Sequence, residues 1–394
     1  MRMRDKEIEK LIHEETERQK RVINLIASEN FVSDDVREAL GSVFTNKYAE
    51  GYPGKRYYGG NEVVDEVERL CQKRALDLFG LSPDAWGVNV QPYSGTPANL
   101  AIYAALVPPG EKIMGMELKM GGHLSHGHKV SLSGKFWQQV PYGVSRADEM
   151  LDYDEILEIA KREKPNLIVA GFTAYSRVID FKAFRKIADA AGATLMADMS
   201  HFAGLVAGKA YPSPFEYADV VMTTTHKTLR GPRGALIFSR KMIYSSGSML
   251  HDLVDKAVFP GMQGGPHVNT IAAIAVALEE AADASFQSYA RQIIKNAQTL
   301  VTALEEKGWR VISGGTDSHL FLVDTMSRGI PGKEAEKRLE AGGIIVNKNT
   351  IPFDERSPVD PSGIRIGTPA VTTRGMKEKD MEKIAEDIDK ILSS

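Results

Sequence analysis

The stretch Val220-Val221-Met222-Thr223-Thr224-Thr225-His226-Lys227-Thr228-Leu229-Arg230-Gly231-Pro232-Arg233-Gly234 is the most informative part of this chain. The apolar run from Ala218 to Met222, broken only by Asp219, predicts a buried strand, and the glycines and proline that follow predict a turn. Most lysines are solvated at the surface. A lysine at the end of a buried strand is costly to keep charged, so it is either paired or used chemically. Hydroxyl and guanidinium groups that can hold a phosphate surround Lys227, and this setting favours a Schiff-base lysine.

A second apolar run, Ala193–Ala197, predicts another strand, and it ends in Asp198-Met199-Ser200-His201. A lone aspartate at such a position is often a helix cap. An acid at the carboxyl end of a buried strand is also suited to pairing with a protonated pyridine nitrogen. Lysine and aspartate in this order are the two protein groups that pyridoxal phosphate requires, so the sequence predicts a site for this cofactor.

Length and composition limit the classes of protein to consider. The chain has 394 residues, enough for two domains at about 100–200 residues each. Its formal net charge of −3 gives no electrostatic footprint for nucleic acid. Cys71 is the single cysteine, which excludes an internal disulfide and a cysteine-rich metal site. The charged N-terminus and the lack of a long apolar run predict a cytoplasmic protein without a membrane span.

Strand and helix patterns alternate from residue 61 to residue 238, which predicts an α/β fold with a mostly parallel sheet and crossover helices. A long helical pattern over 268–306 follows, and a second α/β pattern begins at Trp309. We therefore expect an N-terminal helical segment (1–47), a large cofactor domain (48–278) and a smaller C-terminal domain (279–394). Ligands of such sheets bind at the carboxyl ends of the strands.

Three further segments lie between the predicted elements. Residues 45–60 hold four tyrosines and four glycines without helical or strand periodicity. They form either a surface loop pinned by its tyrosines or a binding loop. Residues 259–266 form a second glycine-rich loop. Ser94, Gly95 and Pro97 precede an apolar helix, which predicts either plain capping or a phosphate seat at the helix N-terminus.

Two motifs leave alternatives open. His123, His126 and His128 alternate with small residues, but their spacing does not match a helix-borne metal pair. We expect no metal, and stacking of one imidazole on an aromatic cofactor is the better use. Arg365 lies between two isoleucines, so it is either a surface residue of an edge strand or a clamp for a carboxylate.

With these residues in view, the chain closely resembles the serine hydroxymethyltransferase family, pyridoxal-phosphate enzymes of fold type I. The likeness covers nearly the whole length, and its motifs are Leu25–Asn30, Tyr48–Gly60, Val88–Asn99, Gly121–Gly127, Asp198–Gly208, Thr223–Gly234, Phe259–Pro266, Asn347–Asn349 and Ile364–Ala370. The resemblance implies reversible hydroxymethyl transfer between serine and tetrahydrofolate, giving glycine and 5,10-methylenetetrahydrofolate. It also implies a homodimer or a dimer of dimers with shared active sites.

The resemblance further implies a role for each motif residue. Lys227 would bind the cofactor aldehyde with Thr224 in the same catalytic motif, Asp198 would hold the pyridine nitrogen protonated, and His123 would stack on the ring. His201 and Thr173 would contact the phenolic oxygen or the substrate. Glu50 would be the acid–base group, with Tyr57 beside it. The phosphate would be held by Ser94, Gly95 and His226, with Tyr48, Gly264 and Gly265 from a second subunit. The amino acid would be held by Ser28, Tyr58 and Arg365, and the folate by Leu118, Gly122, Leu124 and Asn349.

Some residues depart from the family pattern. Thr173 stands where many relatives carry serine, and Lys119-Met120 and Ser357–Ser362 differ beside the expected folate region. Two alternatives are a folate-independent aldolase acting on threonine-like amino acids, and an inactive member that only binds partners. Glu50 and the tyrosine-rich loop favour folate chemistry, and the intact Lys227, Asp198 and Arg365 argue against an inactive protein.

Overall fold

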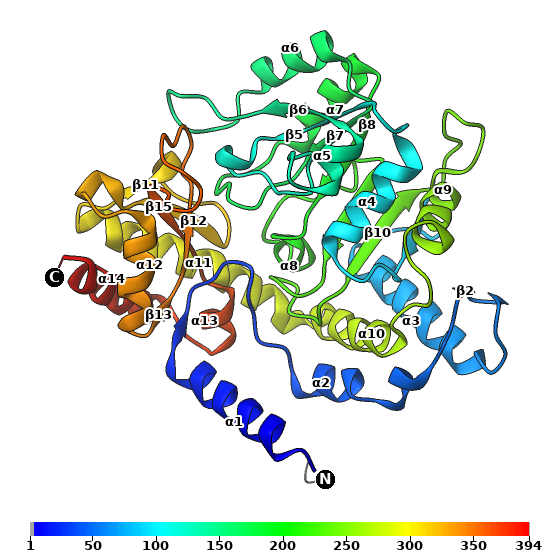
Figure 1. Ribbon diagram of the computed structural model, residues 1–394, viewed down its shortest axis with the longest axis horizontal. Helices are drawn as coiled ribbons and strands as arrows, with labels where there is room; N and C mark the ends of the chain where they lie inside the picture. The colour runs from blue at the N-terminus through cyan, green and yellow to red at the C-terminus, as the bar shows by residue number, and fades with distance from the viewer. Residues whose placement is uncertain (1–3, 394) are drawn as a thin grey trace.

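The computed structural model describes residues 4–393, so Met1–Met3 and Ser394 of the expected terminal segments lie outside it. A seven-stranded sheet in the order β4-β10-β9-β8-β7-β5-β6 forms the centre of the molecule (Figure 1). Strands β5 to β9 run parallel, and β10 is antiparallel to both of its neighbours, which confirms the predicted mostly parallel sheet. The strands are β4 (Trp86–Asn89), β5 (Lys112–Met116), β6 (Gln138–Tyr142), β7 (Leu167–Ala170), β8 (Thr194–Asp198), β9 (Val220–Thr224) and β10 (Ala235–Arg240).

Helices cover both faces of this sheet because its strands are apolar on both sides. Leu195 packs in the cluster that contains Phe184 and Ile274, whereas its neighbour Met196 packs in the cluster that contains Ile102. Successive strand residues point to opposite faces, so both faces need a cover. The helices of this part are α3 (Glu62–Leu78), α4 (Gly95–Leu106), α5 (Leu132–Phe136), α6 (Tyr153–Glu163), α7 (Phe181–Ala191), α8 (Ala203–Ala207), α9 (Leu250–Lys256) and α10 (Val268–Ala282).

A four-stranded sheet in the order β11-β12-β15-β14 forms a second, smaller layer toward the C-terminus. Strand β15 lies between two partners, so the interpretation of Arg365 as an edge-strand residue is wrong. The predicted long helix over 268–306 is two helices, because Asp283 caps the second one by accepting a hydrogen bond from Ser285 N. The elements are α11 (Ala284–Glu306), β11 (Arg310–Val311), β12 (Leu320–Asp324), α12 (Gly332–Ala341), β13 (Ile344–Ile345), β14 (Asn347–Asn349), β15 (Gly363–Gly367), α13 (Pro369–Thr373) and α14 (Glu378–Ser393).

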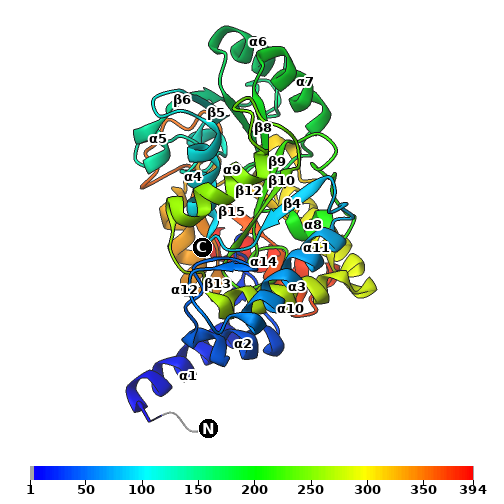
Figure 2. The same cartoon turned by 90° about the vertical axis from the view of Figure 1, so that its right-hand side faces the viewer.

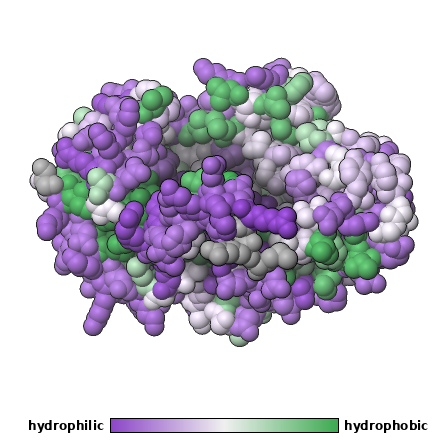
Figure 3. Space-filling model, turned by 60° about the horizontal axis from the view of Figure 1, so that its bottom comes forward, coloured by the Kyte–Doolittle hydropathy of each residue, from purple (hydrophilic) through white to green (hydrophobic). Residues whose placement is uncertain are grey.

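The N-terminal segment runs along both parts. Helix α1 (Lys6–Arg21) buries none of its residues and extends away from the body of the molecule (Figures 1 and 2). Strand β1 (Ile23–Asn24) pairs with β13, and α2 (Asp34–Leu40) packs on α10. The face that carries α1 is mostly hydrophilic (Figure 3). A hairpin of β2 (Gly51–Tyr52) and β3 (Lys55–Arg56) follows, and short helical turns lie at Val43–Asn46, Leu118–Met120, Ala257–Met262, Ile312–Gly314 and Met326–Arg328.

Within residues 4–393, no helix combines the length and apolar character needed to cross a membrane.

Candidate active site

A cavity of about 330 Å³ lies at the carboxyl ends of β7, β8 and β9. It brings together most of the predicted site residues, which come from the large sheet, from β15 and from the N-terminal segment. A larger groove of about 1020 Å³, near α7 and the start of β8, contains none of the predicted residues. The predicted residues that line the smaller cavity are Ser28, Ser94, Gly95, His123, Thr173, Asp198, His201, Thr224, His226, Lys227 and Arg365.

Lys227 lies in the turn that follows β9. Its backbone carbonyl accepts a hydrogen bond of 2.9 Å from Asn30 Nδ2, which fixes the turn. Within residues 4–393, its Nζ makes no hydrogen bond or ion pair. Burial lowers the pKa of Lys227 to about 8, with the charge of Asp198 opposing the shift and that of Arg365 adding to it. About a tenth of this amine is therefore uncharged at pH 7, far more than for an ordinary lysine, and the uncharged form is the one that acts as a nucleophile.

Asp198 is the last residue of β8 and accepts hydrogen bonds on both carboxylate oxygens. His126 Nε2 (3.0 Å) and Asn99 Nδ2 (3.1 Å) reach Oδ2, and Ser200 N reaches Oδ1 at 3.1 Å. Burial alone would raise the pKa of Asp198, but the hydrogen bond and charge of His126 hold it well below its usual range. Asp198 therefore stays ionised inside the cavity, where it can hold a proton on a facing ring nitrogen.

His126 and Asn99 are functional residues that the sequence did not reveal. His126 belongs to the histidine-rich stretch, for which metal binding and ring stacking are the two alternatives. Asn99 carried no signal beyond its place after the predicted phosphate seat. Their contacts to Asp198 join residues far apart in the chain, so spacing along the sequence could not reveal them.

An anion seat lies at the start of α4. Ser94 is the N-cap of this helix, but its side chain makes no capping bond, which leaves its hydroxyl free. Gly95 is required here because a Cβ would lie 2.7 Å from Thr224 Cγ2. Within the described residues, the buried atoms Thr224 Oγ1 and His226 Nδ1 have no hydrogen-bond partner. Free N–H groups, hydroxyls and an imidazole around one helix N-terminus fit a phosphate group.

Arg365 enters the cavity from β15, and only 6% of it is exposed. Its Nη1 donates to Thr173 O at 2.8 Å and its Nε donates to Asn347 Oδ1 at 3.1 Å. Burial lowers the pKa of this guanidinium to about 10, so it remains charged at neutral pH. The backbone carbonyl and the amide fix the guanidinium plane without neutralising its charge, which suits it to bind a carboxylate.

Two histidines face the cavity in neutral form. Burial lowers the pKa of His123 to about 4, and its Nδ1 lies 2.7 Å from Ser125 Oγ. His201 Nδ1 lies 3.1 Å from His319 Nε2, and burial lowers the pKa of both imidazoles. His319, which the sequence analysis did not single out, fixes the orientation of the His201 ring. A neutral, flat imidazole is suited to stacking on a cofactor ring.

The remaining predicted residues lie outside this cavity. Glu50, Tyr57 and Gly264 line a separate hollow of about 430 Å³ together with the loop 259–263. Tyr48 Oη donates to Glu50 Oε1 at 3.1 Å, and the Tyr48 and Tyr58 rings meet edge to face at 4.9 Å. Gly265 lies beside Tyr48, with a Cβ at this glycine 3.9 Å from that ring. The two glycine-rich loops of one chain thus form a single surface, with Tyr57 and Tyr58 at least half exposed.

The residues expected to bind folate, Leu118, Gly122, Leu124 and Asn349, line neither cavity. Gly122 is required by space, because a Cβ there would lie 2.0 Å from Met116 O. Of the departures noted beside them, Met120 packs against Gly143 and Lys119 Nζ approaches Asp354 O at 3.5 Å. Lys119 and Met120 therefore make contacts within the protein.

The residues of the cavity fit pyridoxal phosphate. The unpartnered Thr224 and His226 atoms and the free Ser94 hydroxyl match its phosphate, and Asp198 matches its ring nitrogen. Lys227 offers an amine of lowered pKa to its aldehyde.

Comparisons with known proteins agree with this geometry. The family model described as "Serine hydroxymethyltransferase" matches residues 1–388. A serine hydroxymethyltransferase of Desulfotalea psychrophila is 52% identical over 394 residues, which cover 100% of this chain and 90% of that protein. One from Koribacter versatilis is 54% identical over 380 residues, covering 96% of this chain and 87% of that protein. The chain therefore belongs to the serine hydroxymethyltransferase family.

Proposed function

We propose that the cavity around Lys227 binds the amino acid and the cofactor of this family, and that the surface around Glu50 completes the site for the hydroxymethyl group and the folate. The protein is a pyridoxal-phosphate-dependent transferase that interconverts serine and tetrahydrofolate with glycine and 5,10-methylenetetrahydrofolate. This assignment of residues depends most on one observation: one cavity is lined by Lys227, Asp198, Arg365 and Ser94 at the start of α4.

Pyridoxal phosphate, when bound, supplies an aldehyde that reacts with amines and a ring that draws electrons from the substrate's α-carbon. Lys227 would hold the cofactor through its aldehyde, and the lowered pKa of this amine would let it take and return a proton near neutral pH. Asp198 would hold a proton on the ring nitrogen, because His126, Asn99 and Ser200 keep its carboxylate in the ionised state.

Arg365 orients the substrate through its carboxylate. Thr173 O and Asn347 fix the guanidinium plane, so a carboxylate meets a preset group and little side-chain freedom is lost on binding. Ser28, which lines the same cavity, supports the amino acid from the N-terminal segment. His201, whose ring His319 orients, and Thr173 would contact the cofactor's phenolic oxygen or the substrate.

Glu50 acts as the acid–base group at the hydroxymethyl carbon, with Tyr57 and Tyr58 beside the substrate. In one chain Glu50 and Lys227 line different cavities. We propose that Glu50, Tyr48, Tyr57, Tyr58, Gly264 and Gly265 serve the cavity of a second copy, in a homodimer or a dimer of dimers. The exposed tyrosines and the exposed apolar side chains Ile8, Leu11 and Ile12 of α1 support this, because such groups are suited to an interface.

The folate is proposed to bind beside Leu118, Gly122, Leu124 and Asn349. We also propose the division of the chain into segments 1–47, 48–278 and 279–394, and a cytoplasmic location. The two sheets with their own buried clusters support the division.

The direct test of the assigned activity is glycine formation from serine by the purified protein, with and without tetrahydrofolate. We expect glycine to form rapidly when tetrahydrofolate is present and slowly without it, and Lys227→Ala to lack both activities. The matched control is Lys129→Ala, an exposed lysine outside the cavity, which should be normal. Equal rates with and without tetrahydrofolate would contradict the transferase role and indicate a folate-independent aldolase.

A further inference from the structure

Arg56 is a buried arginine at the base of the tyrosine-rich loop. It lies on β3, opposite Gly51 in the hairpin, and only 5% of its side chain is exposed. It lines neither the Lys227 cavity nor the Glu50 hollow. The proposed binding of cofactor, amino acid and folate therefore gives Arg56 no role.

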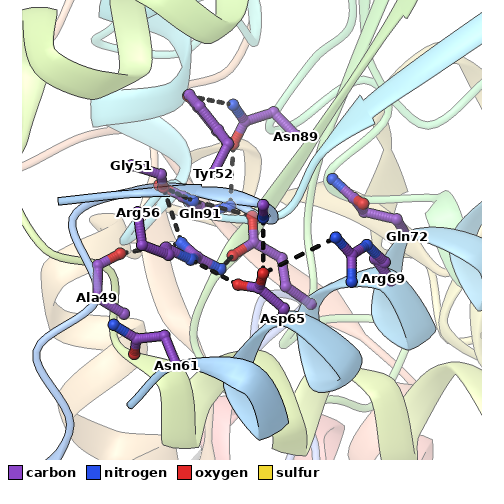
Figure 4. A network of polar contacts seen from close by, with 12 residues as sticks. Ala49, Gly51, Tyr52, Arg56, Asn61, Asp65, Arg69, Gln72, Asn89 and Gln91 are labelled. Atoms are coloured by element: carbon purple, nitrogen blue, oxygen red, sulfur yellow. Dashed lines mark hydrogen bonds and ion pairs between the residues drawn. The ribbon is translucent and has the colours of Figure 1, made fainter. Parts of the chain in front are cut away.

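The guanidinium of Arg56 contacts the backbone at Ala49 and at Gly51 (Figure 4). Its Nη1 donates to Ala49 O at 2.9 Å and to Gly51 O at 2.8 Å, the carbonyls that flank Glu50 in the chain. The carbonyl of Glu50 itself accepts a hydrogen bond of 3.0 Å from Tyr57 N. The carbonyls of Ala49, Glu50 and Gly51 are thus all held by hydrogen bonds. These bonds fix the backbone at Glu50 and therefore the direction in which its side chain points.

The other side of the guanidinium is anchored to helix α3. Arg56 Nε donates to Asp65 Oδ1 at 2.8 Å, and Nη2 donates to Glu68 Oε2 at 2.5 Å. The Glu68 side chain is 1% exposed, and its second oxygen accepts a bond of 2.8 Å from Gln91 Nε2. Gln91 Nε2 also donates to Gly51 O at 2.9 Å. The guanidinium of Arg56 therefore connects the loop to α3. Gln91, which follows β4, makes a further contact with the loop at Gly51.

A stabilising ion pair alone does not account for this arrangement. Buried ion pairs add little net stability, because desolvation offsets their attraction. Arg69, on helix α3, offers a comparison, because its exposed side chain also approaches Asp65, at 3.8 Å. Arg69 has no hydrogen bond to the carbonyls of residues 49–51 in the described part of the chain. What distinguishes Arg56 is its pair of bonds around Glu50.

We propose that Arg56 is a positioning residue for Glu50, and that its guanidinium sets the place of the Glu50 carboxylate by fixing the carbonyls of Ala49 and Gly51 to α3. This inference rests on the proposed acid–base role of Glu50. Lysine cannot replace Arg56, since a single ammonium cannot span two carbonyls and two carboxylates in one plane.

The test uses the cofactor-loaded enzyme and the variants Arg56→Lys, Glu50→Gln, their double mutant and the control Arg69→Lys. Misplacement of a catalytic group by about 1 Å can cost about 100-fold in rate. We expect Arg56→Lys to lower kcat for tetrahydrofolate-dependent serine cleavage by about 10- to 100-fold. Folate-free cleavage of allo-threonine should change by less than about 3-fold. The double mutant should be no slower than Glu50→Gln alone, since both changes remove one function.

A second readout does not depend on activity. Amide hydrogen exchange of peptides covering 48–58 should become faster in Arg56→Lys and stay unchanged in Arg69→Lys. Multiplicative losses in the double mutant, equal losses of both cleavage reactions, or unchanged exchange would each overturn the proposal. If Arg56→Lys does not fold, Glu68→Gln replaces it, because this change removes one carboxylate that anchors Arg56 and keeps the side chain at a similar shape. Glu68→Gln should then show a smaller loss of folate-dependent cleavage and a smaller increase in amide exchange. If it shows neither, the proposal is wrong.

The design separates this inference from the proposed function. If Glu50→Gln keeps normal folate-dependent activity, the acid–base role of Glu50 is wrong, and the catalytic part of the inference falls with it. If Glu50→Gln is impaired while Arg56→Lys is normal, the role of Glu50 holds and the positioning role of Arg56 is wrong.

Discussion

Burial of Lys227 and the contact of Asp198 with His126 determine the charge states in the Lys227 cavity. Lys227 has its pKa lowered to about 8, whereas Asp198 in the same cavity has its pKa held well below the usual range. Each group is therefore kept in the form that its proposed role requires: an amine able to react, and a carboxylate able to hold a proton on the cofactor ring.

The lowered pKa of Lys227 predicts a pH-dependent stability of the cofactor-free protein. The pKa of Lys227 is 10.5 in the unfolded chain and about 8 in the folded protein. Below pH 8 the amine is protonated in both states, and burying this charge destabilises the folded state. Stability should rise between about pH 8 and pH 10.5. Lys227→Met should be more stable than the unchanged protein by ~3 kcal/mol at pH 7, and this difference in the free energy of unfolding should shrink as the pH rises to 10.5. Urea unfolding measures this.

The control for that prediction is Lys129→Met, at an exposed position. It should leave stability almost unchanged across the same pH range. A gap between Lys227→Met and the unchanged protein that stays constant from pH 7 to pH 10.5 would mean that Lys227 has an ordinary pKa.

Arg365→Lys tests the carboxylate clamp. Losing a charged bidentate contact costs about 2–5 kcal/mol, so the KM for serine should rise by tens- to thousands-fold. Arg338→Lys, which alters an exposed ion pair with Glu334, should leave KM unchanged. Steady-state kinetics measures the KM for serine in both variants. A normal KM in Arg365→Lys would show that Arg365 does not bind the substrate carboxylate.

At the level of elements, apolar runs that end in polar residues were predictable from the sequence. Strands β8 and β9, with Asp198 and Lys227 near their carboxyl ends, were expected from such runs, and the structure contains both. Strand β6 was not expected, because Gln138–Tyr142 contains Pro141 and few apolar residues. It lies at the edge of the sheet, where proline is tolerated.

Asp198, Thr224 and Lys227 lie in one cavity because their motifs are at the carboxyl ends of the neighbouring parallel strands β8 and β9. Ser28 and Arg365 come from the N-terminal segment and from β15, so their place in the same cavity depends on the whole fold. The supporting residues His126, Asn99 and His319 could not be assigned, because their contacts form only once the chain has folded. The helical stretch expected over 268–306 is present, and it is divided into two helices for a local reason, the cap supplied by Asp283.

Helix α8 and the turn that carries Lys227 pack closely at Gly204. A Cβ at Gly204 would lie 2.1 Å from Thr228 O, a backbone atom next to Lys227. Gly204→Ala should lower the free energy of unfolding by ~1–3 kcal/mol and reduce activity, because the turn must move.

The control is Gly41→Ala at the end of α2, where a Cβ would lie 3.6 Å from the nearest atom, Arg37 O. Its stability should change by no more than about 0.5 kcal/mol. Thermal unfolding of both variants gives the comparison. If both alanines are equally harmless, the packing of α8 does not hold the Lys227 turn in place.

At the scale of the whole molecule, the proposed site residues lie in two separate places within one chain. Glu50 does not line the Lys227 cavity, and Lys227 does not line the Glu50 hollow. The proposed twofold assembly, in which each chain offers its Glu50 loop to the Lys227 cavity of the other, would bring the two sets of residues together, and twofold dimers are the commonest assembly of soluble oligomers.

Subunit mixing tests this central claim most directly. Lys227→Ala and Glu50→Gln are each expected to lack tetrahydrofolate-dependent activity. Refolding them together in equal amounts gives about half mixed dimers, each with one intact and one doubly altered site, so about a quarter of all sites should become active. Labelled subunits establish that exchange has occurred. Recovery of about a quarter of the unaltered activity is the predicted result, and no recovery despite proven exchange would show that Lys227 and Glu50 act within one chain.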